Sequence, residues 1–264
     1  NTAVGYNAGT DLTTGERNTF IGHEAGKDCI GGGQNVCIGD AAGSGALSAS
    51  AGRNIAIGRN AGQSMTSTTG NVLIGYEAGR AQNYDGAAYV TMVGYQAGED
   101  QTNSAYNTGF GAFNQKSSDT EDHNTSIGYY AMNGANGGGE YNTALGSYVL
   151  SDASQSGDYN VGVGWRALYA ATSGARNVTT GYQAGDGITE GNGNVLIGYD
   201  STQGTVTTHS GNVSIGDQNA HNGGNYEITI GYQIAGLGGN SVTIGSPSGK
   251  VYNVFSLNNT WTQT

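Results

Sequence analysis

Short apolar segments recur along the whole chain, separated by polar stretches rich in Gly, Asn, Ser and Thr. Each segment is a five-residue unit that begins with Asn, continues with a β-branched, a variable and an apolar residue, and ends in Gly. The unit recurs fifteen times, at intervals of mostly 17 to 19 residues that shorten to 15 and 14 at the end. Self-similarity at a nearly fixed period predicts a repeat architecture.

The second and fourth positions of the unit predict a short strand. The second is β-branched in every unit, as in Thr2, Val36 and Ile228, and the fourth is apolar in all but the unit that contains Thr180. Side chains two residues apart share one face of a strand. We therefore expect positions two and four to form the buried face and the variable third position to point the other way.

The Gly that closes each unit predicts a tight corner, because a repeated corner requires a positive φ or a close backbone approach that a Cβ resists. Three residues later, nine units place a small residue that suits the inside of a thin layer: Ala8, Ala25, Ala42, Ala61, Ala78, Ala97, Ala131, Ala167 and Ala184. Polar connections such as 115–123 and 151–159 predict loops.

Stacked units of this kind predict an all-β fold, a repetitive parallel β-solenoid in which each strand pairs with its equivalent in the next coil. We expect residues 1–245 to form a shaft of fifteen coils and residues 246–264 to form a C-terminal tip segment. At about 4.8 Å per stacked strand, fifteen coils span roughly 70 Å. The fold is therefore expected to be a rod.

The small amount of apolar surface in each coil favours association. Two large aliphatic side chains and one Ala contribute about 4 to 7 kcal/mol at the usual ~1.5 to 3 for each large side chain. Ordering about 17 residues of backbone costs on the order of 17 to 34 kcal/mol. A strand with one apolar face is satisfied by equivalent faces around a three-fold axis, so we expect a homotrimer.

Composition and charge narrow the partners. The chain has 264 residues, 49 of them Gly, and a formal net charge of -11 with only nine Lys and Arg, which are scattered singly. No basic stripe is present to bind nucleic acid or anionic lipid, and no apolar run has the roughly 20 residues of a membrane-spanning helix. We expect no nucleic-acid partner and no membrane insertion.

The units resemble two protein families. Asn-Thr-Ala-Val-Gly-Tyr-Asn-Ala-Gly at 1–9 and Asn-Val-Leu-Ile-Gly-Tyr-Glu-Ala-Gly at 71–79 are similar to the repeats of trimeric autotransporter adhesin heads and of phage tail-fibre proteins. The first family implies a left-handed parallel β-roll shared among three chains. The second carries such arrays ahead of an endosialidase-type intramolecular chaperone. The resemblance covers essentially the whole chain.

The C-terminal segment favours the phage family. Residues 250–264 resemble the sequence that precedes the self-cleavage point of that chaperone, which implies a matured fibre from which the chaperone has been removed. The 17-residue period, longer than the adhesin-like 14, supports the same choice. The resemblance therefore implies an extracellular virion tail fibre that contacts other virion tail proteins.

The repeated Asn and the tip aromatics are the candidate sites. We expect the Asn that opens twelve units to form a structural ladder of stacked amides rather than a glycan-contacting row. Its members include Asn18, Asn71, Asn124, Asn177 and Asn212, while Val90, Glu227 and Ser241 replace it in three coils, which we expect to be looser. The simpler role for the aromatic residues of the tip is to seal the end of the trimer. The alternative is that the tip binds a receptor through these aromatics and the two Asn residues beside them, and the candidate residues are Tyr252, Phe255, Asn258, Asn259 and Trp261.

Catalysis and metal binding are not expected. No nucleophile, base and orienting residue recur together, and Cys29 and Cys37 lack zinc-site partners, so they are either free thiols or a pair. We expect no cofactor and no enzyme activity. The favoured function is attachment of a trimeric tail fibre to a host cell-surface glycan or polysaccharide. The alternatives are a cellular trimeric adhesin, a structural extracellular filament and, least favoured, a depolymerase.

Overall fold

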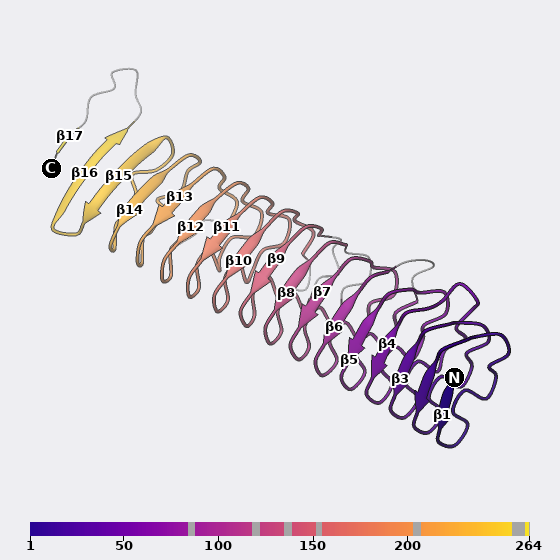
Figure 1. The fold of residues 1–264 in the computed structure, drawn as a ribbon. Coiled ribbons are helices and arrows are strands. Elements are labelled where there is room, and N and C mark those ends of the chain that lie inside the picture. The colour runs from indigo at the N-terminus through magenta and orange to yellow at the C-terminus, as the bar shows by residue number, and fades with distance from the viewer. Residues whose placement is uncertain are drawn as a thin grey trace.

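The chain forms an elongated stack of coils that runs from the N-terminus at one end to the C-terminus at the other (Figure 1). The computed structural model describes residues 1–83, 88–117, 122–134, 139–151, 155–202, 207–254 and 262–263. Every regular element in these residues is a β-strand, with no helix among them. The predicted all-β fold, a repetitive β-roll or β-solenoid, is confirmed.

Fifteen strands pair in parallel, each with its equivalent in the next coil and without a register shift, as in Thr19 opposite Val36 and Ile21 opposite Ile38. The first fourteen strands begin at position two of the repeat, β15 begins at position one, and most strands end at position four. Their bounds are β1 Thr2–Val4, β2 Thr19–Ile21, β3 Val36–Ile38, β4 Ile55–Ile57, β5 Val72–Ile74, β6 Thr91–Val93, β7 Thr108–Phe110, β8 Thr125–Ile127, β9 Thr143–Leu145, β10 Val161–Val163, β11 Val178–Thr180, β12 Val195–Ile197, β13 Val213–Ile215, β14 Ile228–Gly231 and β15 Ser241–Ser246.

The sheet changes character after β15. β16 (Gly249–Val254) pairs antiparallel with β15, with Ser246 opposite Gly249, and β17 (Thr262–Gln263) pairs antiparallel with β16. Pro247 lies in the tight connection between β15 and β16, where a missing backbone N–H interrupts no strand pairing. The parallel shaft therefore ends in a hairpin.

The strands face the opposite way from the sequence-based expectation. The third position is the buried one, with Phe20, Leu73 and Met92 fully enclosed, whereas position four remains 39% exposed at Ile21 and 45% exposed at Ile127. Alternation along a strand defines two faces, but the return of the chain after each corner decides which face it encloses. Each coil thus has its own interior, and the apolar positions two and four lie on the outside.

The corner Gly has the predicted conformation. The Gly at position five of all fifteen units has a φ between +125° and +146°. At Gly164 an added Cβ would overlap the carbonyl oxygen of Gly181 in the next coil. Both the left-handed backbone and the close stacking of coils therefore require Gly at this corner. Eight of the nine predicted inward Ala residues are also buried, with Ala25 and Ala184 at 0% exposure, and Ala8 in the first coil is partly buried.

Backbone hydrogen bonds continue from coil to coil outside the strands. Gly22 N donates to Val4 O at 2.8 Å, and Glu24 N donates to Tyr6 O at 2.8 Å, around the corner that follows β2. The energy comparison that favoured a trimer counted only positions two and four and one Ala in each coil. It left out the hydrogen bonds between coils and the burial of the third positions. The single chain consequently has more internal support than the sequence pattern suggested.

Candidate interaction surfaces

A stripe of apolar and β-branched side chains follows the outer face of the parallel strands from β1 to β15. It consists of positions two and four of every unit, none of which is charged. Where position four is a large apolar residue, it is well exposed in most coils. The exposed fraction is 58% at Val4, 44% at Leu145, 39% at Ile197 and 39% at Ile244. Figure 1 shows the parallel strands stacked one above another along the rod. Because the strands are in register, these side chains form one continuous surface, which we call the outer stripe.

The repeated Asn forms a ladder along one buried edge of the strands. Asn35 N donates to Asn18 Oδ1 at 2.8 Å, and Asn18 Nδ2 donates to Gly32 O at 2.8 Å, so both ends of one amide bind the backbone of the next turn. The bond from the next backbone N–H recurs at the Oδ1 of Asn35, Asn54, Asn71, Asn107, Asn124, Asn142, Asn160, Asn177, Asn194 and Asn212. The ladder satisfies buried backbone donors and leaves no amide row for a ligand.

Glu227 replaces the ladder Asn near the C-terminal end, and its buried carboxylate is hydrogen-bonded to the ring of His221. Its carboxylate lies 3.2 Å from His221 Nδ1 and accepts hydrogen bonds from the backbone N–H groups of Asn222 at 3.1 Å and Gly238 at 2.9 Å. Burial by itself raises the Glu227 pKa, but the hydrogen bonds from His221 and the two N–H groups lower it overall, below the ordinary value of 4.5. The Glu that replaces Asn in this coil is therefore satisfied by hydrogen bonds from other residues than the ladder. The predicted loosening of this coil is untested.

Aromatic rings form a column beside the Asn ladder that the sequence analysis missed. Tyr89, Tyr106, His123, Tyr141 and Tyr159 each precede position one and stack at centroid distances of 6.0, 4.7, 4.8 and 5.2 Å. The last three pairs are nearly parallel, within 6°. The same repeat period that located the strands places these rings one residue before the Asn, and that spacing was the signal for the column.

The rings that follow the corner Gly also stack, as at Tyr76 and Tyr95 (5.0 Å, 9°) and at Tyr182 and Tyr199 (5.0 Å, 5°). A neighbouring ring thus covers one face of each of these side chains, which removes part of the aromatic surface on which a ligand could stack. Packing between coils is therefore the role that the geometry supports for these columns.

The candidate receptor-binding residues at the tip are outside what the structure describes. Phe255, Asn258, Asn259 and Trp261 lie outside the described residues, and Tyr252 is described only as part of β16. Their role as a receptor-binding site stays a prediction.

Cys29 and Cys37 are both buried and free. Burial raises the pKa of Cys29, and burial followed by the neighbouring Cys29 thiol raises the pKa of Cys37 to about 12. Thiols held in this state are poor nucleophiles and poor metal ligands. Across the described residues, no group of three His, Cys, Asp or Glu side chains is placed to hold a metal ion. Those residues also contain no helix suited to crossing a membrane.

Comparisons with known proteins add no evidence about function, which is therefore argued from the fold and the surfaces. No family model matches the chain, and searches of curated proteins and of solved structures find no match.

Proposed function

We propose that this chain is the shaft and tip segment of a homotrimeric bacteriophage tail fibre that attaches the virion to a host surface. The observation that carries the proposal is the outer stripe, an uncharged row of Ile, Val, Leu and Thr side chains that runs the length of the rod and remains exposed in one chain. A soluble protein rarely leaves so long an apolar surface uncovered. We expect further copies of the same chain to cover the outer stripe, because they present the same apolar side chains at the same spacing.

The stripe has the size and symmetry that a shared interface requires. It offers on the order of 1,000 Å² of surface on each chain, which is comparable to one side of a stable protein interface. Its residues repeat with the coils, so parallel copies in register present identical side chains at each level. Three such faces around an axis form a closed apolar core, in keeping with the three-fold symmetry that the resemblance implies.

A trimeric rod suits multivalent attachment. Three identical surfaces bind a repetitive cell-surface glycan or polysaccharide with an avidity well above that of each weak contact. The virion location, the contacts with other tail proteins and the receptor class follow from the resemblance of the repeats to tail-fibre sequences.

Adsorption measurements test the proposal. The purified chain is screened for binding to host envelope glycans, and a variant that lacks residues 246–264 is compared in the same assay. We expect saturable glycan binding that the deletion weakens at least tenfold. Retention of full binding after the deletion contradicts a receptor-binding tip, and absence of binding to any envelope component contradicts the attachment function.

A further inference from the structure

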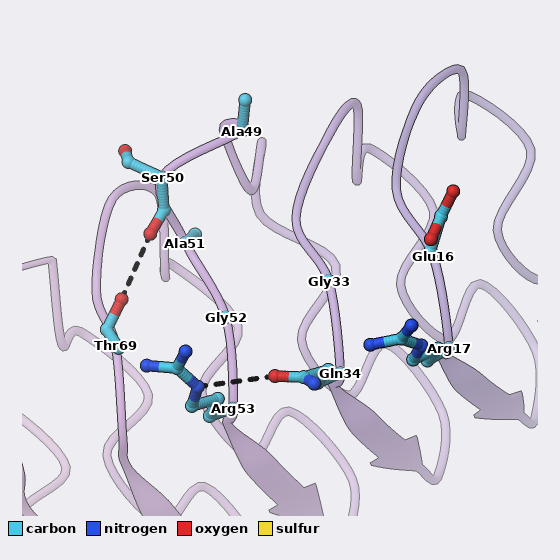
Figure 2. A pocket seen from close by; sticks show the side chains of 10 residues that line it. All are labelled: Glu16, Arg17, Gly33, Gln34, Ala49, Ser50, Ala51, Gly52, Arg53 and Thr69. Atoms are coloured by element: carbon cyan, nitrogen blue, oxygen red, sulfur yellow. Dashed lines mark hydrogen bonds between the residues drawn. The ribbon is translucent and has the colours of Figure 1, made fainter.

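A groove opens on the side of the first four coils, beside the third coil, where the repeat lengthens to 19 residues between Gly39 and Gly58. It has a volume of about 290 Å³, and Figure 2 shows the residues that line it. The backbone of Gly33 and Gly52 lies at its base, and the extra residues of the third coil raise Ala49 and Ser50 as a rim. An added Cβ at Gly52 would overlap the carbonyl oxygen of Gly33, so the backbone of the two coils lies close together under the groove.

Two arginines and a glutamine line one wall in coil order. Arg17, Gln34 and Arg53 occupy the position before the ladder Asn, and all have a φ near +60°. Figure 2 shows the Gln34 side chain between the two guanidinium groups, with Arg53 Nε donating to Gln34 Oε1 at 3.2 Å. The two arginines are two coils apart, or about 10 Å at the usual strand spacing.

Neither arginine is neutralised by a carboxylate among the residues that the structure describes. Every ion pair found there involves other cations, such as Arg80 with Glu99 and Lys116 with Glu99. The chain carries only nine Lys and Arg against twenty Asp and Glu, so two unpaired guanidinium groups in one groove are a local exception to its charge. Their position favours an anionic ligand.

We propose that this groove binds a carboxylate-bearing polysaccharide segment, with Arg17 and Arg53 each holding one carboxylate. A guanidinium group presents a planar fork of donors that matches a carboxylate. The separation of the two arginines suits carboxylates on alternate sugars, and the Gln34 amide between them has donors and an acceptor for sugar hydroxyl groups. The biological meaning rests on the proposed attachment function, but binding by the groove is measured independently of adsorption.

Glu16 sets the limit on affinity. Glu16 also lines the groove, and Figure 2 shows its carboxylate pointing away from the Arg17 guanidinium group. A negative charge in this position repels an acidic ligand and narrows the choice to one whose carboxylates avoid the Glu16 side. Removal of that charge by Glu16→Gln is expected to strengthen binding about two- to fivefold, since an exposed charge pair has a modest effect.

Titration calorimetry of the full chain with hyaluronan octasaccharide, which has a carboxylate on every second sugar, tests the proposal. Arg17→Gln and Arg53→Gln are each expected to weaken binding about tenfold, the usual scale for one charged hydrogen bond. Arg176→Gln is the matched control, because Arg176 has the same place in the repeat and a φ of 59° but lies outside the groove. It is expected to bind as the unmodified chain does.

Ligand controls separate a glycan site from a general anion site. The carboxyl-reduced octasaccharide is expected not to bind, and inorganic phosphate is expected to compete only weakly. Equal binding by the Arg17→Gln, Arg53→Gln double variant overturns the proposal, as does an equal loss in Arg176→Gln or phosphate competition at the affinity of the octasaccharide. Circular dichroism of each variant checks that the coils remain folded. Groove binding without host adsorption would overturn the attachment function and leave the site intact.

Discussion

The interior of the rod differs between its first coils and the coils near its middle, although the strands outside are alike. From β2 to β6 the interior is apolar, with Phe20, Leu47, Met65, Leu73 and Met92 fully buried in one cluster. From the turn after β6 to β8 it becomes polar, and the buried side chains include Gln101, Ser104, Asn114, Gln115 and Ser126. A second apolar cluster follows, with Met132, Leu150, Leu168 and Leu196 among its members.

The polar interior is held by side-chain hydrogen bonds in place of apolar packing. Gln101 Nε2 donates to Gln115 Oε1 at 3.0 Å, Gln115 Nε2 donates to Ser126 Oγ at 2.6 Å, and Ser126 Oγ donates to Asn114 Oδ1 at 2.6 Å. Two chemically different interiors thus fit the same coil. The corner Gly, the Asn ladder and the paired backbone define the coil, and the third position of the unit adapts to what fills it.

Truncation of Leu73 should produce the largest loss of stability. Leu73→Ala removes a fully buried side chain that packs against Gly79 and Gly62, and such cavities cost about 2 to 5 kcal/mol. We expect a clear fall in the urea midpoint, measured by circular dichroism. The exposed Leu237→Ala is the control, and an equal effect of the two substitutions would contradict an apolar interior as the support of these coils.

Truncation of Gln115 should cost less. Gln115→Ala removes the acceptor of the Gln101 amide and one of the two hydrogen bonds of the Ser126 hydroxyl, which keeps its bond to Asn114, a loss of about 1 to 3 kcal/mol. Hydrogen exchange should show the loss concentrated in β7 and β8. A variant as stable as the original chain would mean that the polar network contributes nothing beyond filling space.

Acid should loosen the C-terminal coils more gently. The folded-state pKa of Glu227 is lowered, so its contribution to stability is complete above its ordinary pKa of 4.5 and is lost as the pH falls through the lower folded value. We expect protection of β14 from hydrogen exchange to decline below about pH 4.5, and Glu227→Gln to remove this dependence on pH. A decline of the same size in the variant would assign the effect to other carboxylates.

The smallest effect, a difference in reactivity alone, should be found at the two thiols. Cys29 and Cys37 lie in the apolar interior, where burial raises the pKa of both. We expect no alkylation by iodoacetamide in the folded chain at pH 8 and complete alkylation in urea, followed by mass spectrometry. Rapid alkylation of Cys37 in the native protein would show that the first coils open readily.

The coil geometry was predictable because it depends on residues that recur. The fifteen strands, the corner at Gly164 and the buried Ala184 follow from the period and from the limits that a Cβ places on the backbone. The inward face was not predictable in the same way. Ile and Val at positions two and four indicate a surface that is favourable to bury. The same residues are typical of an interface between chains and of the core of a single chain, so the pattern does not distinguish the two.

The burial of the third position was also not predictable from the sequence. Its residues range from Phe20 to Ser126, and this variety resembles a solvent-exposed face, although both side chains are buried. The groove was also hidden from the sequence, because it depends on a longer third coil and on which side chains become neighbours 17 to 19 residues apart. The tip residues stay a prediction.

The mass of the chain in solution tests the central claim that further copies cover the outer stripe. Analytical ultracentrifugation at micromolar concentration is expected to give three times the chain mass, and Ile127→Asp with Ile197→Asp on the stripe should shift the population toward single chains while Arg176→Gln should not. A stable, soluble monomer that remains dispersed with its outer stripe exposed would contradict the account.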